Sequence, residues 1–572
     1  MRISDTFYRE ITSKKLWTSI PTLLLCAQSV VSVAAARPRA SQNSTYSSIE
    51  EYHRQRDDLI AQERALRFDA ERIRNATSRE IEASEIVDVL RRQEEVNIWS
   101  ADPNKELGMP FLWAKETIAQ TELFKLIKKM PKGGLLHVHM DAMCDASYLL
   151  KLALEYPIMH VQTTGPLNSS SPYPLPMFKP LTQEELNQAT NNALPTSQEY
   201  IPGSWVAVQR AREGFPNELG GQEGFDKWII GALSISAEET YQQLNTSTKI
   251  WKKFGSTFAV GGSILRYEPI WRRYVDQLLV SQIEDGISYT ELRISFDPSL
   301  KPVLSEDATR NLTSSQVVNL TISAIEEVDK RMRAQGREKD FVGARAIYTT
   351  GRAISREAMA QSLDECLALK AEYPEFLVGF DMVSKEDGGH SLVYFLEELL
   401  SFRAEADKRG LDIPFIFHAG ETLDDGGEVD SNLYDALLLG SKRIGHGFSL
   451  AKHPLLMQKY RDNGIAVEVC PISNEILRFT RSANTHPLPI LLNHGVPVAL
   501  SSDDPSVFQN PGLSFDFYQA MVVSNITSLI SLGQLARQSL EYSSLNSSTK
   551  AHALKNWEDR WSTFLDDIIA SK

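Results

Sequence analysis

The sequence predicts an α/β protein built on a (β/α)8 TIM barrel. From Pro131 onward, eight short apolar runs alternate with helical stretches, and polar and charged residues cluster where these runs end. Buried strands separated by helices predict a parallel sheet, and eight of them in one domain predict a barrel, which holds its chemistry at the carboxyl ends of its strands. The expected strands are Gly134–Met140, Ile287–Ile294, Val342–Tyr348, Phe376–Met382, Pro414–His418, Lys442–His446, Ile465–Val469 and Val496–Ser501.

The composition fits a large globular domain with additions. The chain has 572 residues, of which 42% are hydrophobic and 23% are charged, and this is enough for a barrel with further segments. The formal net charge is −14. Proteins that bind nucleic acid need a basic surface, so the acidic balance argues against a nucleic-acid partner.

The N-terminus has the pattern of a signal peptide over residues 1–36. Lys14 and Lys15 precede an apolar run at 16–34, and small residues at 34–36 offer a cleavage site. A membrane anchor is the alternative, but the run is short and contains Pro21. No later stretch is long and apolar enough to span a bilayer, so we expect a secreted, extracellular protein without stable membrane insertion.

Sequons and cysteines agree with this compartment. Cys26 falls within the expected signal peptide, and the odd number that remains implies no disulfide framework. We expect buried thiols at Cys144, Cys366 and Cys470, with one bridge as the alternative. Asn-x-Ser/Thr sequons, which fit a secreted glycoprotein, begin at Asn43, Asn75, Asn168, Asn245, Asn311, Asn319, Asn525 and Asn546.

Two segments lie outside the expected barrel pattern of residues 110–572. Residues 37–109 are predicted to form a helical segment that mediates a homodimer, with a barrel-capping or a solvated charged helix as alternatives. Its apolar stripe consists of Leu59, Leu66, Ile73, Ile81, Ile86 and Leu90. Residues 165–221 lie in an overlong gap after the first strand and are rich in Pro, Ser and Asn, which predicts an inserted lobe.

The first strand ends in two histidines suited to metal binding. Strand alternation puts His137 and His139 on one face, where paired imidazoles are natural ligands for a divalent metal. The fifth strand ends at His418, followed by Glu421 just past the turn. Alone, each of these has an ordinary explanation, a core or rim histidine or a glutamate at a helix start.

The sixth and eighth strands add further polar groups. His446 lies between two glycines, which leave room for close approach to a metal-bound water or substrate. Asp503 and Asp504 end the last strand, where one carboxylate can complete a metal site and its neighbour can bind substrate. A turn or helix cap is the ordinary alternative for the two aspartates.

Together these residues predict a zinc hydrolase. Three histidines and one aspartate at the ends of the first, fifth and eighth strands suit zinc and leave a position for water. Zinc lowers the pKa of that water, which makes hydroxide available near neutral pH. Attack on a ring carbon that bears an amine needs a proton donor and a charge stabiliser, and Glu421 and His446 can fill these roles.

The combined motifs resemble those of the adenosine deaminase family, and more closely its secreted branch, the adenosine deaminase-related growth factors. The resemblance covers the chain from Pro110 to the C-terminus in the correct order. It rests on Gly133–Asp141, His418–Thr422, Arg443–Gly447 and Ser502–Pro505, with support from Gly379–Asp381, Glu386–Ser391 and Glu468–Asn474. It implies a zinc-dependent adenosine deaminase that converts adenosine, and 2′-deoxyadenosine, to inosine and ammonia.

Carried over residue by residue, the resemblance also implies roles. The implied zinc ligands are His137, His139, His418 and Asp503. Glu421 would protonate the purine ring at N1, and His446 would orient and help activate the hydroxide. Asp504 would accept a hydrogen bond from the purine N7 side, Asp141 would hold the ribose, and Trp251 would border the ribose pocket.

Two positions depart from the family pattern. Ser384 stands where the family has a glycine whose backbone amide meets the purine, so its hydroxymethyl group would crowd the base. Gly351 stands where some relatives carry a histidine near the ribose. These departures bear on substrate affinity and range more than on the reaction type.

Two other functions remain open from sequence. The first is a zinc deaminase for adenine, AMP or a modified nucleoside, although we find no motif for a basic phosphate pocket. The second is a secreted signalling protein that binds a cell-surface receptor or glycan. The complete ligand set and Glu421 argue against a barrel that has lost its activity.

Overall fold

The computed structural model describes residues 48–168, 173–188, 193–297, 300 and 302–571. The expected signal peptide and the sequon at Asn43 lie outside these residues. The chain divides into two compact units, residues 1–59 and 60–572. Of the first unit, the structure describes residues 48–59, which include the first part of helix α1 (Ile49–Arg64).

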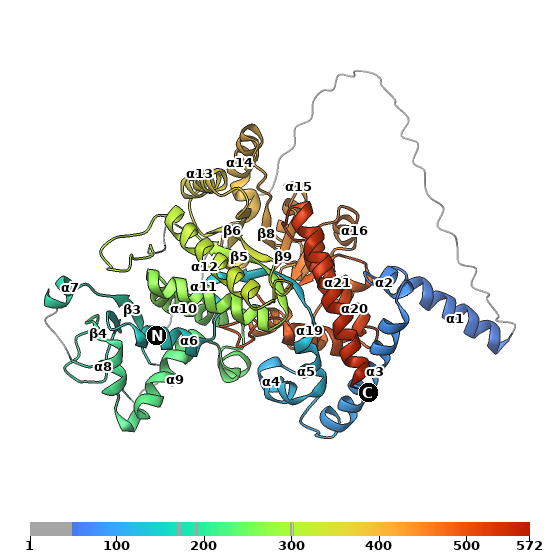
Figure 1. Cartoon of the computed structure of the whole chain (residues 1–572), viewed down its shortest axis with the longest axis horizontal. Helices are drawn as coiled ribbons and strands as arrows, with labels where there is room; N and C mark the ends of the chain where they lie inside the picture. The colour runs from blue at the N-terminus through green and yellow to red at the C-terminus, as the bar shows by residue number, and fades with distance from the viewer. Residues whose placement is uncertain (1–47, 169–172, 189–192, 298–299, 301, 572) are drawn as a thin grey trace, which may run out of the picture. The chain divides into compact units, whose positions relative to one another are not determined.

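Eight parallel strands form the centre of the second unit (Figure 1). They pair as two four-stranded sheets, in the orders β1-β5-β6-β7 and β11-β10-β9-β8. Parallel bridges between Val138 and Asp503 and between Phe380 and Phe415 join the sheets at both seams, as an eight-stranded barrel requires. The strands are β1 (Gly133–His139), β5 (Ile287–Ser295), β6 (Gly343–Gly351), β7 (Leu377–Val383), β8 (Ile416–Ala419), β9 (Arg443–His446), β10 (Ala466–Val469) and β11 (Val498–Leu500).

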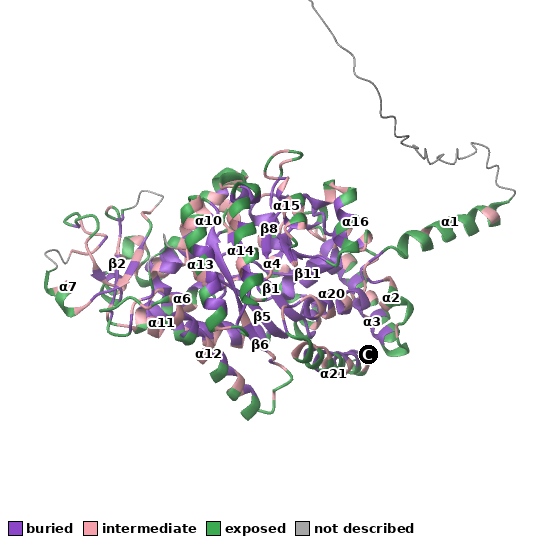
Figure 2. Ribbon diagram, turned by 90° about the horizontal axis from the view of Figure 1, so that it is seen from above, coloured by how far each residue is buried: buried purple, intermediate pink, exposed green. Residues whose placement is uncertain are grey.

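The expected TIM-barrel fold is therefore confirmed, and each of the eight expected strands is present with small shifts at its ends. All eight are buried runs, as strands covered on both faces must be. In Figure 2 they form a buried centre surrounded by helices whose outer faces are exposed.

Helices connect successive barrel strands and cover the outside of the barrel. The helix α12 begins with a capping box in which Thr313 and Gln316 satisfy each other's backbone N–H groups. Gly410, at φ 67°, ends α14 in the left-handed conformation that glycine adopts without strain. The covering helices are α12 (Ser314–Ala334), α13 (Arg356–Glu372), α14 (Leu396–Arg409), α15 (Asn432–Leu438), α16 (Pro454–Asp462), α17 (Pro471–Ile476), α18 (Leu488–Asn493), α19 (Ser514–Val522), α20 (Leu529–Glu541) and α21 (Ser547–Ala570).

A long segment lies between β1 and β5, as the sequence gap requires. Its described residues contain a three-stranded antiparallel sheet, in the order β3-β2-β4, and six α-helices, the last of which leads into β5. Its elements are α6 (Ala146–Glu155), β2 (Met159–Gln162), β3 (Met177–Pro180), α7 (Gln183–Gln188), β4 (Val206–Ala207), α8 (Val208–Glu213), α9 (Gly221–Leu233), α10 (Ser247–Leu265) and α11 (Glu268–Glu284).

The described segment before the barrel is helical. Its elements are α2 (Ala70–Arg74), α3 (Ser78–Glu94), the π-helix η1 (Glu95–Trp99), α4 (Phe111–Gln120) and α5 (Glu122–Lys129). Helix α3 packs against α20 and α21, and its fully buried apolar residues are Ala83 and Val87. Part of the predicted apolar stripe instead faces outward, because the exposed residues include Leu59, Leu66, Ile73 and Ile81.

The cysteines and the helix lengths bear on two smaller points in the described part of the chain. Cys144, Cys366 and Cys470 are buried free thiols. No helix among the described residues is long and apolar enough to cross a membrane.

Candidate active site

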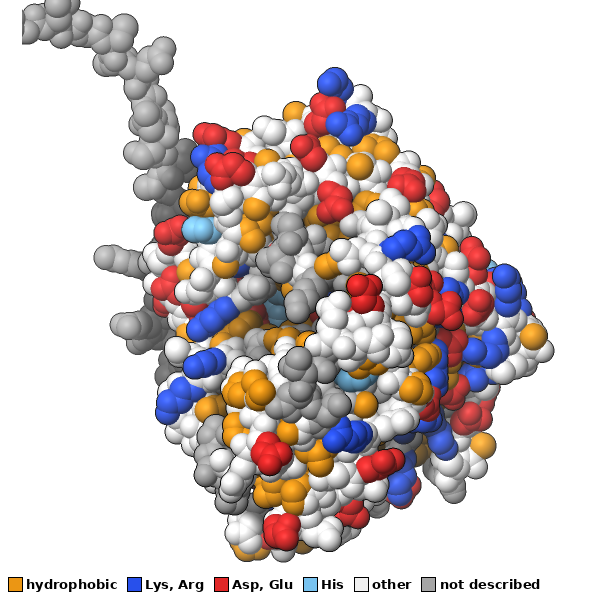
Figure 3. All heavy atoms as spheres, turned by 90° about the vertical axis from the view of Figure 1, so that its left-hand side faces the viewer, with side chains coloured by type: hydrophobic (Ala, Val, Ile, Leu, Met, Phe, Trp, Pro, Cys, Tyr) orange, Lys and Arg blue, Asp and Glu red, His pale blue; other side chains and the backbone are white. Residues whose placement is uncertain are grey.

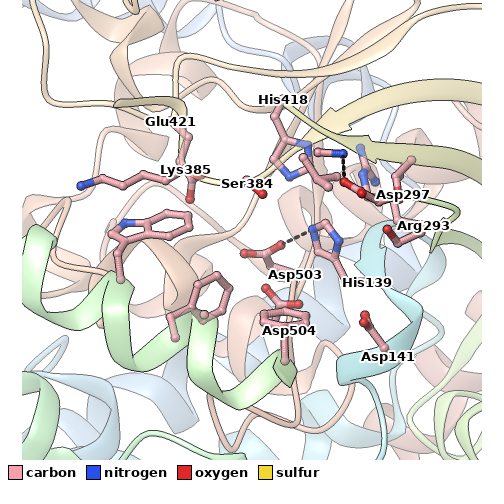
Figure 4. Close-up of a pocket in the computed structure, with 18 of the residues that line it drawn as sticks. His139, Asp141, Arg293, Asp297, Ser384, Lys385, His418, Glu421, Asp503 and Asp504 are labelled. Atoms are coloured by element: carbon pink, nitrogen blue, oxygen red, sulfur yellow. Dashed lines mark hydrogen bonds and ion pairs between the residues drawn. The ribbon is translucent and has the colours of Figure 1, made fainter. Parts of the chain in front are cut away.

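A cavity of about 420 Å³ opens at the carboxyl ends of the barrel strands (Figure 4). Its walls come from the ends of the barrel strands and from helix α10. Nine of the ten residues singled out from sequence line it: His139, Asp141, Trp251, Ser384, His418, Glu421, His446, Asp503 and Asp504. The tenth, His137, is fully buried next to them, with its ring centroid 4.5 Å from that of His418.

Four side chains converge as a candidate metal cluster. One ligand atom from each lies within 4.8 Å of every other, in the set His137, His139, His418 and Asp503. Asp503 Oδ1 is 3.3 Å from Nε2 of His137 and 3.3 Å from Nε2 of His139. The sequence placed these residues at the ends of three strands, and the barrel brings them together.

Carboxylates behind the cluster determine which imidazole nitrogens carry protons. His137 Nδ1 lies 2.9 Å from Glu468 Oε2, and His418 Nδ1 lies 2.7 Å from Asp381 Oδ2. Ionised carboxylates only accept hydrogen bonds, so both Nδ1 atoms must donate. Each Nε2 atom is thereby left with a lone pair that can bind a metal.

The cluster fits a divalent cation. His137 Nε2 and Asp503 Oδ1 are both buried, and neither has a hydrogen-bond partner among the described residues. Two lone pairs that face each other at 3.3 Å repel unless a cation lies between them. Burial lowers the pKa of His418 to about 3, so its imidazole is neutral, as a metal ligand must be.

A buried arginine links the supporting carboxylates. Arg293, on β5, donates to Asp381 Oδ2 and to Glu468 Oε2, both at 2.8 Å. Burial alone would raise the pKa of both carboxyls, but Arg293 and the neighbouring histidines hold them well below the usual range. These groups therefore remain charged and keep the histidine rings oriented.

Asp503 is held in an unusual backbone conformation. Its φ is 61°, a left-handed value that costs free energy for a residue other than glycine. Its backbone N–H donates to the His137 carbonyl, and Ser473 Oγ donates to Asp503 Oδ2 at 2.7 Å.

Glu421 lies at the cavity with its carboxyl group in a buried position. Its Oε1 has no hydrogen-bond partner among the described residues and lies 3.6 Å from Nδ1 of His446. Burial, and then the charges of Asp503 and Glu386, raise the pKa of Glu421 well above its usual value. This environment favours the protonated form of the carboxyl group, the form that can act as an acid.

His446 is a buried, neutral imidazole. Burial lowers its pKa well below the usual value, and Asn474 Nδ2 lies 3.2 Å from its Nδ1. The flanking glycines serve packing rather than substrate, which corrects the sequence-based interpretation. A Cβ on Gly445 would lie 2.5 Å from the His137 ring, and one on Gly447 would lie 2.5 Å from Val467.

The other expected substrate-binding residues surround this centre. Burial, and then the charge of Asp503, raise the pKa of Asp504 well above its usual value. Trp251, on α10, packs edge to face against Phe254 with ring centroids 5.0 Å apart. Ser384 lies just after β7 with φ 86°, a conformation that glycine adopts without strain.

Sequence reasoning missed several residues of the site. Asp297 and Lys385 line the cavity, and Arg293 and Glu386 hold its groups in place. Asp297 could have been found, because it follows the second barrel strand at the edge where chemistry is expected. Arg293 gave no such signal, since one arginine within an apolar strand does not reveal its partners.

Comparisons with known proteins identify the family. The family model described as adenosine deaminase matches residues 218–559, and the one described as adenosine/AMP deaminase N-terminal matches residues 23–127. The chain is 34% identical to an adenosine deaminase of Lutzomyia longipalpis, over 79% of this chain and 81% of that protein. It is 32% identical to adenosine deaminase 2 of Sus scrofa, over 81% of this chain and 84% of that protein.

A solved structure supports the fold. The apo structure of the N6-methyl-AMP deaminase from Arabidopsis thaliana aligns with a TM-score of 0.50 and 17% identity, over 76% of this chain and 98% of that one. The family match covers more than half of the chain, and the adenosine deaminase 2 relatives agree with the growth factor branch that the motifs indicated. The chain therefore belongs to the adenosine deaminase family, and with it to the hydrolases that remove the amine of adenosine.

Proposed function

We propose that this protein is a secreted, zinc-dependent adenosine deaminase that hydrolyses adenosine, and also 2′-deoxyadenosine, to inosine and ammonia. The observation that carries this proposal is the presence, in one cavity, of a candidate cation-binding cluster and of the buried carboxyl group of Glu421, whose pKa is raised well above its usual value. Hydrolytic removal of a ring amine needs both, a nucleophile generated at neutral pH and an acid that protonates the ring.

The proposed zinc ligands are His137, His139, His418 and Asp503. Zinc bound in this cluster supplies a water of lowered pKa as the nucleophile. Glu421, protonated and buried, donates to N1 of the purine as electrons move onto that nitrogen. The neutral imidazole of His446, whose Nδ1 lies 3.6 Å from Glu421 Oε1, orients the nucleophile and helps to activate it by hydrogen bonding.

Asp504 binds the purine as a donor in this scheme. N7 of adenine has a lone pair and no proton, so an ionised carboxylate cannot bind it. Burial and the charge of Asp503 favour the protonated form of the Asp504 carboxyl group, and its O–H can then donate to N7. We therefore propose that Asp504 donates to N7, the opposite direction to the one that the resemblance implied.

The remaining cavity residues bind the rest of the nucleoside. The backbone N–H of Ser384 meets the purine, Asp141 accepts from the ribose, and Trp251 borders the ribose pocket. The described lysine and arginine residues that line the cavity are Lys385 and Arg293, and Arg293 is already paired with two carboxylates. Lys385 alone does not form a basic pocket for a phosphate group. A nucleoside fits this setting better than a nucleotide does.

Secretion, glycosylation and dimerisation complete the proposal. The seven sequon asparagines in the described part of the chain are all exposed, as glycan attachment requires. On the face drawn in Figure 3, lysine and arginine side chains are interspersed with acidic ones, which does not favour nucleic acid. The partners we propose are a second copy of the chain and a cell-surface receptor or glycan.

An ammonia-release assay on the purified full-length protein tests the function. We expect activity with adenosine and 2′-deoxyadenosine, loss of activity after a chelator, and recovery when zinc returns. AMP, adenine and N6-methyl-AMP serve as competing substrates. If the protein prefers one of these, that compound and not adenosine is the substrate. Turnover that is unaffected by zinc removal would overturn the metal assignment.

A further inference from the structure

Asp297 is a cavity residue that the roles above leave unused. It comes just after β5, is half-buried, and lines the same cavity as Asp141. In the view of Figure 4, Asp297 and Asp141 lie on the side of the cavity opposite Lys385. This wall therefore presents two carboxylates to whatever the cavity binds.

The carboxylate of Asp297 is fixed by the neighbouring strand. The backbone N–H of Gly351, at the end of β6, donates to Asp297 Oδ2 at 2.9 Å. A Cβ at position 351 would lie 2.6 Å from that same oxygen, which is closer than real contacts allow. Glycine at 351 thus provides the space that the Asp297 carboxylate occupies, and the two positions act as a pair.

Arg266 adds a positive charge behind this wall. Burial lowers the pKa of Arg266, and the charges of Asp141 and Asp297 oppose that shift, so the guanidinium lies within electrostatic reach of both carboxylates. Arg266 also lies with Asp297 around an adjoining cavity. Arg266 therefore lies behind the wall, while the carboxyl groups of Asp141 and Asp297 face the cavity.

The position of the base determines what meets this wall. If the carbon that loses its amine lies at the metal cluster, Glu421 and Asp504 bind the ring nitrogens, and the sugar must fill the rest of the cavity. Its aromatic side is formed by Trp251, Phe254 and Phe258 of α10. The polar side left for the sugar hydroxyls is the wall that carries Asp141 and Asp297.

We infer that Asp297 is a further substrate-binding residue, which accepts a hydrogen bond from a ribose hydroxyl and selects for an unphosphorylated sugar. This inference rests on the proposed function. Carboxylates accept and do not donate, so hydroxyl groups satisfy them, whereas the oxygens of a phosphate do not. A phosphate on the sugar is also repelled by the like charge of the Asp297 carboxylate.

The test compares matched variants on substrates that lack single hydroxyls. Asp297→Ala removes the acceptor, and Gly351→Ala displaces it through the close contact at Oδ2. Asp307→Ala removes an exposed carboxylate from the same connection outside the cavity and is the control. For each protein, kcat/KM is measured with adenosine, 2′-, 3′- and 5′-deoxyadenosine, and AMP.

We expect kcat/KM of the wild-type protein to be about 10- to 100-fold lower for at least one deoxynucleoside than for adenosine, because that substrate lacks a hydrogen bond to a charged group. In Asp297→Ala and Gly351→Ala this preference falls by about tenfold or more, because KM changes rather than kcat. The ratio of kcat/KM for AMP to kcat/KM for adenosine rises in both variants. Asp307→Ala keeps the wild-type ratios. A general loss of folded or metal-loaded protein lowers kcat/KM for all substrates alike and leaves the ratios between substrates unchanged.

Two failures are distinguishable. If the wild-type protein deaminates adenosine but both cavity variants keep its ratios for all three deoxynucleosides, Asp297 binds no ribose hydroxyl and the inference is wrong while the function stands. If the wild-type protein shows no deamination of adenosine, the proposed function fails and the inference falls with it.

Discussion

The backbone N–H of Glu421 donates a hydrogen bond of 2.7 Å to Oε1 of Glu386, so that one buried glutamate holds another in place. The second oxygen of Glu386 accepts from Asn432 Nδ2 at 2.7 Å and lies 3.6 Å from the guanidinium of Arg352. The Glu386 charge also contributes to the raised pKa of Glu421, after burial and the charge of Asp503. Both the place and the protonation of the proposed acid therefore depend on Glu386.

Glu386→Gln tests this dependence. Glutamine keeps an acceptor for the Glu421 N–H but removes a negative charge, so the pKa of Glu421 falls. Glu421 then loses its proton at lower pH, and we expect the alkaline limb of the kcat/KM profile to move to lower pH by the order of one unit. Zinc content should not change. Glu428→Gln, an exposed site that binds Ser391, should leave the profile where it is.

The barrel could be predicted because its signals are local. Each strand is a short apolar run bounded by turns. A run such as Ile287–Ile294 can therefore be recognised from its own residues, without knowledge of the segments that pack against it. The same holds for His137 and His139, which share a strand face because strands alternate. Placing them beside His418 and Asp503 needed only the barrel rule that strand ends converge.

The rest of the site depends on contacts between distant segments. Arg293 is buried between Asp381 and Glu468, which come from two other strands, and no local pattern pairs them. The spaces beside His446 looked like room for substrate, yet the ring of His137 fills one of them. The raised pKa of Asp504 follows from its burial and the neighbouring charge of Asp503, which the Ser502–Pro505 motif alone does not reveal.

Glu475 predicts a pH-dependent stability. It is fully buried on α17, where Oε1 accepts from Tyr241 at 2.6 Å and from the Phe111 N–H at 2.7 Å. Burial raises its pKa to about 7. The folded state therefore binds more protons than the unfolded state between about pH 4.5 and 7, and stability falls as pH rises through that window, by about 3 kcal/mol in total.

Glu475→Gln removes this cost because glutamine is neutral at every pH. We expect the variant and the wild-type protein to unfold at similar temperatures near pH 4.5, and the variant to unfold at a higher temperature above pH 7. The exposed Glu184→Gln is the control and should follow the wild-type protein. A difference between variant and wild type that does not change with pH contradicts the assignment of the titration to Glu475.

Ser384→Gly should relieve backbone strain beside the substrate. At φ 86°, a serine is less stable than a glycine by the order of 1 kcal/mol, so the variant should melt at a higher temperature. Loss of the hydroxymethyl group should also lower KM or widen the range of purine nucleosides accepted, by about the same free energy. Unchanged melting and kinetics across several nucleosides would leave Ser384 without a role.

The proposed dimerisation through the N-terminal helices can be tested separately from folding. Helix α1 buries none of its residues, whereas α3 buries Ala83 and Val87 against the C-terminal helices. Deleting residues 37–64 should therefore preserve the fold, while deletion as far as 105 should also cost stability. We expect the mature chain to sediment as a dimer and the shorter deletion as a monomer with an unchanged circular dichroism spectrum. A dimer that persists in the shorter deletion rules out α1 as the interface.

Comparison of Glu421→Gln with Asp503→Ala tests the mechanism most directly. The cation-binding set is complete without Glu421, since three imidazoles and Asp503 already converge. Glutamine has nearly the same size as glutamate and keeps the backbone contact with Glu386, but it cannot transfer a proton to the purine. Hence Glu421→Gln should retain zinc and fold while kcat falls by a factor of about 10² or more.

Asp503→Ala should lose zinc and activity together, because it removes the carboxylate that faces both His137 and His139. Zinc content by elemental analysis, measured beside kcat for the two variants, separates the two roles. Loss of zinc in Glu421→Gln would make Glu421 a ligand rather than the acid. Near-normal turnover in a zinc-loaded Glu421→Gln would mean that another group protonates N1, and His446, 3.6 Å away, would be the next residue to substitute.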